Sequence, residues 1–342
     1  MISEKLSQLD LYDFENFDNV TLKIHSQALK NNPLQDPHIR RHPILQPKGD
    51  EPKEGFPVVL LLAGYGSNGS KNFAWRSFEQ NEAQRIDSLV SEGKAPRAHY
   101  VFVDNWTFWG GSQFINSEAV GQYEDHLVQE LVPALRQNFN LSKDPRFWCV
   151  CGGSSGGYGA LHLASRHPHL FGLVAAQAPD SFFEASLLPE IYGGWPYWKA
   201  LGGLEGLRQE LLEGRLLQKR YAHRLLNVVA MGLCYAPVGK KSFAWPIEEP
   251  GGQLLAEVWR RWKFWDPLEF LPRHQEALKQ WAGAYLDVGE RDQFNLQFGA
   301  RQIRDLLVGL GVSLSYSEFA GDHFDLGSRR PEMWSWLNQQ WS

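Results

Sequence analysis

The stretch that decides the fold is Cys151-Gly152-Gly153-Ser154-Ser155-Gly156-Gly157-Tyr158-Gly159. It follows the apolar run Phe147-Trp148-Cys149-Val150, which is typical of a buried strand. It precedes Ala160-Leu161-His162-Leu163-Ala164-Ser165-Arg166, which is typical of the first turns of a helix. A Gly-x-Ser-x-Gly sequence between a strand and a helix predicts a nucleophile elbow, a strained turn that lifts one serine hydroxyl clear of the sheet edge. The next backbone N–H then lies beside any oxyanion that forms there.

Two serines compete for the role of nucleophile in this turn. Gly152-Gly153-Ser154-Ser155-Gly156 selects Ser154, whereas Gly153-Ser154-Ser155-Gly156-Gly157 selects Ser155. We prefer Ser154, because two glycines then follow the nucleophile at the point where the helix packs against the strand. The backbone N–H of Ser155 would then be an oxyanion donor. A glycine-rich turn without chemistry is disfavoured by five glycines within eight residues.

Charge and hydropathy exclude two classes of partner. The chain has 342 residues with 34 basic and 39 acidic side chains, a formal net charge of −5. This balance gives no electrostatic footprint for nucleic acid, and no run rich in lysine and arginine is present. Nowhere do about 18 apolar residues run together. We therefore expect no nucleic-acid partner and no association with a membrane.

The amino-terminal segment and the cysteines indicate a cytoplasmic protein. The first 25 residues alternate charged and apolar groups, without the continuous apolar core of a secretory signal. Three cysteines do not make a disulfide framework. We interpret Cys149 and Cys151 as buried apolar side chains on one face of the elbow strand, because no further metal ligands are evident nearby. The sequence does not decide whether the chain forms a homo-oligomer.

Alternating strand and helix patterns predict the fold class. Residues 19–25 and 39–45 are expected to be antiparallel neighbours. Further strands are expected at 57–63, 98–104, 147–150, 173–178, 282–288 and 312–319, and helices at 78–90, 119–139, 160–166, 300–310 and from Pro331 onward. This alternation predicts an α/β protein with a mainly parallel central sheet and helices on both faces. We expect residues 1–342 to form a single domain.

The interval from about residue 181 to 272 departs from this alternation, because it has helical stretches but no convincing strand. It is expected to be an insertion between two sheet strands, folded over the strand ends as a cap. A helical layer that only packs is an equally good interpretation. Six tryptophans of the chain lie in the interval: Trp195, Trp198, Trp245, Trp259, Trp262 and Trp265. If the interval is a cap, these side chains are expected to roof an aromatic or otherwise flat substrate.

Chain order selects the base and the acid that a serine nucleophile needs. In the elbow fold the nucleophile is followed by an acid and then by a histidine. His323 lies immediately after the last predicted strand, so we predict that it is the base. Asp292 lies just past the preceding strand, so we predict that it is the acid, with Asp180 and Glu290 as alternatives. Asp287 lies inside that strand and is interpreted as structural.

The loops that follow the other predicted strands supply the remaining candidates. The second oxyanion donor is expected in the loop after the strand at 57–63, from the N–H of Tyr65, with Gly66 as the alternative. We also expect Gly66, Trp106, Ser112 and Asp180 to contact the substrate. The proposed chemistry requires no metal ion and no organic cofactor.

These motifs resemble those of the "Putative esterase" family of α/β-hydrolases, which includes esterase D, feruloyl esterases, enterochelin-type esterases and mycolyltransferases. The elbow at 152–161 is similar to the family's Gly-x-Ser-x-Gly-Gly-x-Gly-Ala-Leu, a register that selects Ser154. Residues 289–292 and 321–323 are similar to its acid and histidine loops, and residues 110–133 to the stretch before the elbow. The resemblance covers roughly residues 20–180 and 265–342. The family often has His-Gly before the oxyanion loop, where this chain has Ala63-Gly64, and the tryptophan-rich insertion is not a general feature.

The resemblance and the motifs together predict a serine esterase with an α/β-hydrolase fold. Ser154 would attack an ester carbonyl, His323 would accept its proton, and Asp292 would orient the imidazole. A small-molecule ester is the expected substrate. Two alternatives remain open at this level: an acyltransferase that uses the same triad, and a non-catalytic binding protein built on a hydrolase scaffold.

Overall fold

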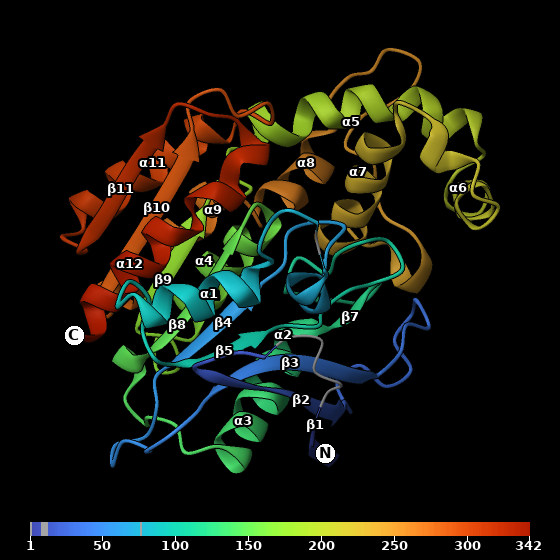
Figure 1. Ribbon diagram of the computed structural model, residues 1–342. Coiled ribbons are helices and arrows are strands. Elements are labelled where there is room, and N and C mark those ends of the chain that lie inside the picture. Colours follow the sequence, from blue (N-terminus) through green and yellow to red (C-terminus); the bar gives the residue numbers. More distant parts are fainter. Residues whose placement is uncertain (1, 8–12, 76) are drawn as a thin grey trace.

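The computed structural model describes residues 2–7, 13–75 and 77–342, which form a mixed sheet with helices on both of its faces (Figure 1). The main sheet has the strand order β1-β2-β3-β5-β4-β8-β9-β10-β11. Its strands are β1 (Ile2–Ser7), β2 (Phe17–His25), β3 (Ile39–Pro47), β4 (Val58–Leu62), β5 (His99–Phe102), β8 (Trp148–Gly153), β9 (Leu173–Gln177), β10 (Gly283–Gly289) and β11 (Leu314–Phe319). A separate small hairpin pairs β6 (Asn116–Ser117) with β7 (Gly121–Gln122).

The sheet has a parallel part and an antiparallel edge. Strands β5, β4, β8, β9, β10 and β11 run parallel to their neighbours in that order. Strands β1, β2 and β3 pair antiparallel and join the parallel part where β3 meets β5. The predicted antiparallel pairing of residues 19–25 with 39–45 is therefore confirmed. Because six neighbouring strands point the same way, the loops at their carboxyl ends gather at one edge of the sheet.

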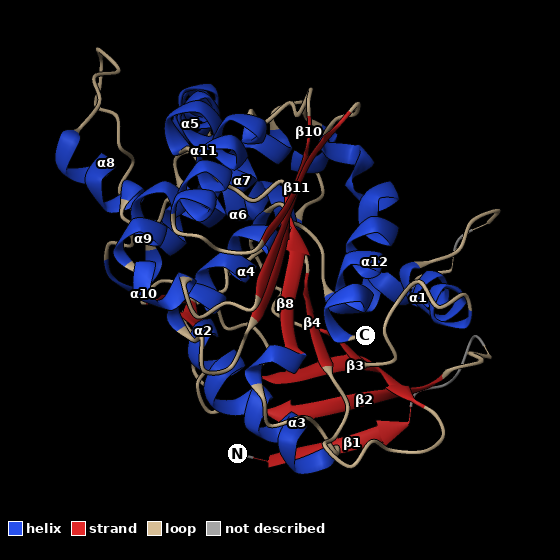
Figure 2. Cartoon of the chain, turned by 90° about the vertical axis from the view of Figure 1, so that its left-hand side faces the viewer, coloured by secondary structure: helices blue, strands red, loops and turns tan. Residues whose placement is uncertain are grey.

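Helices cover both faces of the sheet. Figure 2 shows α1 and α12 on one face and α3, α4 and α11 on the other. The helices outside the insertion are α1 (Glu82–Ser91), α2 (Tyr123–Asp125), α3 (Val132–Asn138), α4 (Ser155–Arg166), α11 (Leu296–Gly309) and α12 (Arg330–Trp341). The single helix expected at 119–139 is instead interrupted by a π-helical segment, His126–Leu131. Pro133 follows it and has no N–H to continue the α-helical ladder.

The apolar strands are buried on both sides, as their continuous hydrophobic sequences predict. Along β4, Val58, Leu60 and Leu62 belong to the core beneath α4, while Val59 and Leu61 belong to the core beneath α1 and α12. Strand side chains alternate between the two faces, so a strand covered on both faces has no polar position. The α/β architecture that the strand and helix pattern predicts is therefore confirmed, and it is consistent with the α/β-hydrolase fold implied by the family resemblance.

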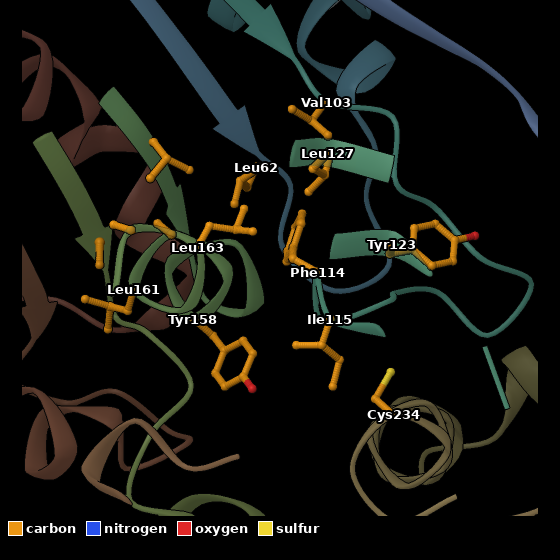
Figure 3. Packing of buried hydrophobic residues seen from close by; sticks show 14 of the residues in the cluster. Leu62, Val103, Phe114, Ile115, Tyr123, Leu127, Tyr158, Leu161, Leu163 and Cys234 are labelled. Carbon is orange, nitrogen blue, oxygen red and sulfur yellow. The ribbon is translucent and has the colours of Figure 1, made fainter. Parts of the chain in front are cut away.

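The larger core continues from the sheet into the insertion. Figure 3 shows Phe114 below the Leu62 end of β4 and beside α4, and Ile115 between Tyr158 of α4 and Cys234 of the insertion helix α7 (Ala222–Tyr235). All five side chains are at most 1% exposed. Gly159 makes this packing possible, because a Cβ there would lie 2.2 Å from the Phe114 ring. The insertion therefore shares the core of the sheet instead of forming a separate one.

The insertion between β9 and β10 is helical. Its helices are α5 (Phe183–Ala200), α6 (Leu204–Leu212), α7 (Ala222–Tyr235), α8 (Ala256–Lys263), α9 (Pro267–Arg273) and α10 (Gln275–Leu278). Figure 1 shows α5 to α8 beyond the end of the sheet toward which β10 and β11 point. Buried Asp266 ties the two ends of this segment together. Its carboxylate accepts hydrogen bonds from the N–H groups of Phe182 and Phe183 at 3.0 and 2.8 Å and from the Lys263 ammonium at 2.8 Å.

The tryptophans of the insertion pack mainly against other aromatic side chains. The ring of Trp245 lies 5.1 Å from that of Trp195 and 5.4 Å from that of Trp198, between ring centroids. Trp262 is fully buried against Tyr235 and Phe243. These rings stabilise the insertion from within. In the part of the chain that the structure describes, each helix is too short or too polar to cross a lipid bilayer.

The buried carboxyl of Asp287 in β10 makes the stability depend on pH. It accepts a hydrogen bond from Tyr285 at 2.7 Å, and burial raises its pKa from 3.8 to about 6. The folded state therefore favours the protonated acid. The resulting stabilisation is fully present below the pKa that Asp287 has in the unfolded chain, and it is lost as the pH rises through about 6.

We predict that Asp287→Asn removes this dependence. The free energy of unfolding of the wild type, relative to the variant, should fall by up to about 3 kcal/mol between about pH 4 and about pH 7. Urea unfolding of both proteins across this range measures the difference. A constant offset between them would contradict the prediction.

Candidate active site

The elbow has the strained geometry that its sequence predicts. Ser154 lies between β8 and α4 with φ 57° and ψ −126°, a conformation that L-residues rarely adopt. Two backbone hydrogen bonds hold it there: its N–H donates to the Gln177 carbonyl at 2.8 Å, and its own carbonyl accepts from the Tyr158 N–H at 2.9 Å. The neighbouring strand β9 and the first turn of α4 therefore fix the position of this serine.

The glycines beside Ser154 are required by close backbone approach. A Cβ on Gly152 would lie 2.6 Å from the Leu62 carbonyl oxygen, and a Cβ on Gly156 would lie 2.3 Å from the same atom. Both distances are far below a normal contact, so side chains at these positions would push α4 away from β4. The Gly-x-Ser-x-Gly spacing thus lets the end of β4 lie directly beside the elbow.

Two loops meet at the elbow where oxyanion donors are expected. Ser155 is the first residue of α4, and the first N–H groups of a helix have no partner within it. The loop after β4 brings Gly64 and Tyr65 into the same pocket. The N–H of Gly66, the alternative donor, is engaged with the Gly110 carbonyl at 2.9 Å. Of the two residues weighed for the second donor, Tyr65 therefore fits better.

The predicted acid and base lie in direct contact. The Nδ1 of His323 lies 2.7 Å from Oδ2 of Asp292, and Oδ1 of the same carboxylate accepts the Phe294 N–H at 2.9 Å. Asp292 is 2% exposed. Because a carboxylate accepts hydrogen bonds, this contact places the imidazole proton on Nδ1 and leaves Nε2 as the basic atom.

Packing between the loops after β10 and β11 enforces this contact. Gly289 pairs with Phe319 at the ends of the two strands. A Cβ on Gly289 would lie 2.7 Å from the Gly321 carbonyl oxygen, which also accepts the Arg291 N–H at 3.0 Å. The His323 N–H donates to the Gln293 side chain at 2.9 Å. The acid and histidine loops are therefore one hydrogen-bonded unit.

A pocket of about 200 Å³ contains both Ser154 and His323. Its lining from the sheet edge comprises Gly64, Tyr65, Ser154, Ser155, Asp180, Phe294, Leu296, His323 and Phe324. Its lining from the insertion comprises Ser186, Leu187, Glu190, His223, Asn227 and Met231, on α5 and α7. The insertion therefore closes over the site as a cap. None of its tryptophans is in this lining, so the expected aromatic roof is not formed by them.

Asp180, predicted both as an alternative acid and as a substrate contact, lies against the elbow. Its Oδ2 accepts the Ser155 hydroxyl at 2.7 Å, and its Oδ1 accepts the Ser154 hydroxyl at 3.4 Å. Glu290, the other alternative acid, has its N–H bonded to the Phe319 carbonyl at 2.9 Å and is not in the pocket lining. Among these three carboxylates, the one hydrogen-bonded to His323 is Asp292.

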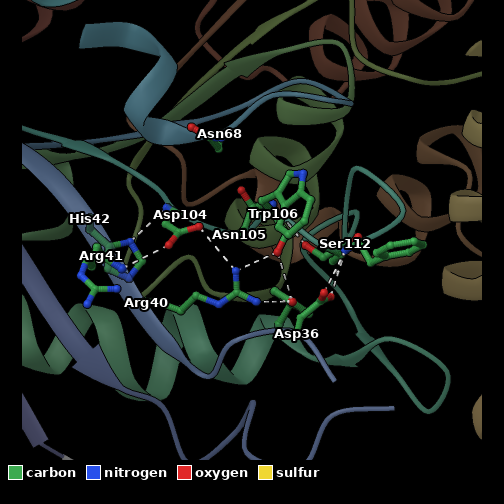
Figure 4. A network of polar contacts seen from close by, with 12 residues as sticks. Asp36, Arg40, Arg41, His42, Asn68, Asp104, Asn105, Trp106 and Ser112 are labelled. Carbon is green, nitrogen blue, oxygen red and sulfur yellow. Dashed lines mark hydrogen bonds and ion pairs between the residues drawn. The ribbon is translucent and has the colours of Figure 1, made fainter. Parts of the chain in front are cut away.

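Trp106 and Ser112 lie in the loop after β5, in a polar network behind the pocket (Figure 4). The Trp106 carbonyl accepts from Arg40 at 2.7 Å, and the Ser112 hydroxyl accepts from Asn105 at 3.1 Å. Neither residue, nor Gly66, is in the pocket lining. Trp106 and Ser112 are held within this network, and the contact of all three residues with a substrate stays a prediction.

Several residues in or next to the pocket had no signal in the sequence. Gln113 has φ 50°, and its amide donates to Asp180 at 3.2 Å and to the Tyr235 hydroxyl at 2.9 Å. His223 stacks edge-on against Tyr65, with 5.8 Å between ring centroids. The residues that α5 and α7 contribute carry no motif and could be found only by folding the cap. Among the described residues, no group of three or more His, Cys, Asp or Glu side chains could hold a metal ion.

Comparison with known proteins identifies the family. The model of the family described as "Putative esterase" matches residues 39–324, so the chain belongs to this esterase family. It is accordingly an enzyme of the serine esterase class, a carboxylic ester hydrolase. The resemblance inferred from the elbow and the two loops is confirmed.

Individual relatives are distant. The uncharacterized protein YbbA of Bacillus subtilis is 21% identical over 203 residues, 54% of this chain and 76% of its own. Among solved structures, a ferulic acid esterase superposes with a TM-score of 0.60 at 16% identity, over 96% of this chain and 100% of its own. An S-formylglutathione hydrolase from Agrobacterium tumefaciens superposes with a TM-score of 0.53 at 14% identity, over 95% and 96%. At these identities the structures establish the shared fold.

We predict that Gly156→Ala damages the elbow. Because its Cβ would lie 2.3 Å from the Leu62 carbonyl oxygen, the variant should lose about 1–3 kcal/mol of stability and most of its activity. Gly309→Ala is the matched control, because a Cβ at this exposed helical glycine meets nothing within 4 Å. Thermal unfolding of both variants measures the difference, and equal midpoints would contradict the prediction.

Proposed function

We propose that this enzyme hydrolyses carboxylic esters through an acyl-enzyme on Ser154, with His323 as general base and Asp292 as the orienting acid. The observation that carries the proposal is the 2.7 Å contact between His323 and the buried carboxylate of Asp292, in a pocket that also contains Ser154. This combination supplies a nucleophile, a base and a carboxylate in the chain order typical of the fold.

Each catalytic step has a group to perform it. In the first step Nε2 of His323 would accept the Ser154 proton while Oγ attacks the ester carbonyl carbon. The imidazolium then gives the proton to the departing alcohol. A water molecule attacks the acyl-enzyme with His323 again as base, which releases the carboxylic acid and restores Ser154. Asp292 stabilises the imidazolium in both steps.

The oxyanion of each tetrahedral intermediate would be bound by the N–H groups of Ser155 and Tyr65. Ser155 lies at the amino terminus of α4, where the helix dipole favours negative charge. Such preorganised donors are each worth about 10²–10³ in rate. The Tyr65 ring is held by a hydrogen bond from its hydroxyl to the Trp109 carbonyl at 2.8 Å, which steadies the loop that carries its N–H.

The Ser154 hydroxyl must turn for catalysis to begin. Its hydrogen bond in this structure goes to Oδ1 of Asp180, at 3.4 Å. This is a long bond, and rotation about one side-chain torsion redirects the proton toward the imidazole. Long catalytic hydrogen bonds are common before a substrate binds.

We predict that three substitutions abolish turnover while preserving the fold. Ser154→Ala and His323→Ala should each lower kcat/KM for a short acyl ester by about 10⁴-fold or more. Asp292→Asn should lower it by about 10⁴-fold, because an amide can select the wrong tautomer of His323. Hydrolysis of 4-nitrophenyl acetate measures the rates, and circular dichroism checks the fold.

The control is His169→Ala, which removes an exposed histidine outside the pocket lining and should leave the rate unchanged. A fluorophosphonate probe should label the wild type on Ser154 and should not label Ser154→Ala. Folded wild-type protein that takes up no probe would favour a non-catalytic role. Near-normal turnover in any of the three variants would refute the role of that residue.

A further inference from the structure

The charges that line the pocket are acidic. Asp180 and Glu190 are in the lining, and no lysine or arginine is. Glu190 has a partner, since the Arg224 guanidinium donates to its Oε1 at 3.0 Å. Asp180 has no ion pair with any Lys or Arg that the structure describes. It is therefore the acidic group of this pocket that has no lysine or arginine partner.

Neutral groups supply the hydrogen bonds that Asp180 accepts. Its Oδ2 accepts from the Ser155 hydroxyl at 2.7 Å and from the Gln113 amide at 3.2 Å, while Oδ1 accepts from the Ser154 hydroxyl at 3.4 Å. The side chain is 7% exposed. Burial raises its pKa, and the nearby His323 lowers it. A buried carboxylate without a cation is costly, and a bound cation would offset that cost.

Catalysis makes this imbalance larger. Ser154 has one hydroxyl proton, and in the proposed reaction that proton goes to His323. Oδ1 of Asp180 then loses the donor that it has in this structure. A carboxylate oxygen without a donor, in a site closed by the cap, needs a new donor at the moment that the substrate is in place. The substrate itself is the group that can supply it.

Distance limits where that donor can be on the substrate. Oδ1 of Asp180 lies 3.4 Å from Ser154 Oγ. The carbonyl carbon of a bound ester must lie about 3–3.5 Å from the same Oγ before attack. These two distances allow a substituent on the carbon next to the carbonyl to come within hydrogen-bonding reach of Oδ1.

A second side chain in the pocket also lacks a partner. Asn227 of α7 is 7% exposed and lines the pocket, and its amide makes no hydrogen bond to any residue in the described part of the chain. A buried amide without partners is rare unless it faces a ligand or water. Its carbonyl oxygen can accept a hydrogen bond, and so can Oδ1 of Asp180 once the Ser154 hydroxyl has turned to His323. The pocket therefore offers two acceptors from opposite sides, one from the sheet edge and one from the cap.

We propose that Asp180 binds an ammonium group on the acyl side of the ester, next to the scissile carbonyl, so that the enzyme acts on small aminoacyl esters. This inference rests on the proposed ester hydrolysis by Ser154. The ammonium donates to Oδ1 of Asp180 and neutralises its charge, while the proton of Ser154 turns to His323. The pocket volume of about 200 Å³ suits a short acyl group of this kind.

The test compares two esters of the same shape. Ethyl L-alaninate carries an ammonium where ethyl isobutyrate carries a methyl group. Titration of the released acid gives the rate for each ester. The quantity to compare is the ratio of kcat/KM for ethyl L-alaninate to kcat/KM for ethyl isobutyrate. Asp180→Asn keeps an acceptor for Ser155 and removes the charge, and it should lower the ratio by about tenfold or more. Because the ratio is compared between proteins, the different intrinsic reactivities of the two esters cancel.

Matched controls distinguish a direct contact between Asp180 and the ammonium group from a general effect of the charge of the pocket. Glu190→Gln removes a charge from the same pocket but one that Arg224 already balances, so it should change the ratio by less than about threefold. An equal loss in both variants would assign the preference to the general charge of the pocket and overturn the proposal. If Asp180→Asn slows the hydrolysis of both esters by the same factor, Asp180 only positions Ser154, and the proposal is overturned. Isobutyrylcholine tests the other side: a loss confined to this ester would place the cation on the alcohol and overturn the acyl-side assignment.

A second measurement uses the wild type, in case Asp180→Asn does not fold. Boronic acids form a tetrahedral adduct with a nucleophilic serine. The compound 1-aminoethylboronic acid should inhibit about tenfold or more tightly than isopropylboronic acid, which has the same shape without the charge. Equal inhibition would overturn the proposal. Wild-type protein that hydrolyses 4-nitrophenyl acetate without this preference would refute the aminoacyl substrate alone, whereas protein inert to all esters and to the fluorophosphonate would refute ester hydrolysis.

Discussion

The parallel alignment of β4, β8, β9, β10 and β11 is the constraint on which the site depends. Each of these strands ends at the same edge of the sheet, so each contributes the residue that follows it. The glycine at 156 then lets α4 start beside the end of β4, and the glycine at 289 lets the last two loops touch. Without these close backbone approaches, side chains as far apart in the sequence as Tyr65 and His323 could not line one pocket.

The cap adds the chemical character of the pocket. The sheet edge carries the groups that any ester would need, whereas α5 and α7 supply Glu190, His223 and Asn227. Its aromatic residues pack within the insertion and against the sheet core, and so hold these helices in place. Asp266 joins the two ends of the segment at its base. Family membership defines the class of reaction, and the cap forms part of the pocket wall beside Ser154 and His323.

Much of the fold could be predicted because its signals are local. The buried strands are continuous apolar runs, and the elbow is marked by the spacing of its glycines around Ser154. The π-helical interruption at His126–Leu131 could not be predicted. The spacing of apolar residues indicates a helix, but it does not show to which carbonyl each N–H will donate. The contact between Asp292 and His323 was predicted from chain order, whereas the position of Gln113 depends on a left-handed backbone that glutamine rarely adopts.

The sequence by itself determined the α/β class, the strained turn at Ser154 and the family, because steric limits on glycine and the period of apolar residues act over a few neighbouring positions. The tertiary structure decided among the three carboxylates that chain order had left open for the contact with His323. It also decided which N–H groups remain available beside Ser154, and what the tryptophan-rich insertion does. These outcomes depend on distances between segments far apart in the chain. Such distances are set by how whole elements pack, and no local pattern encodes them.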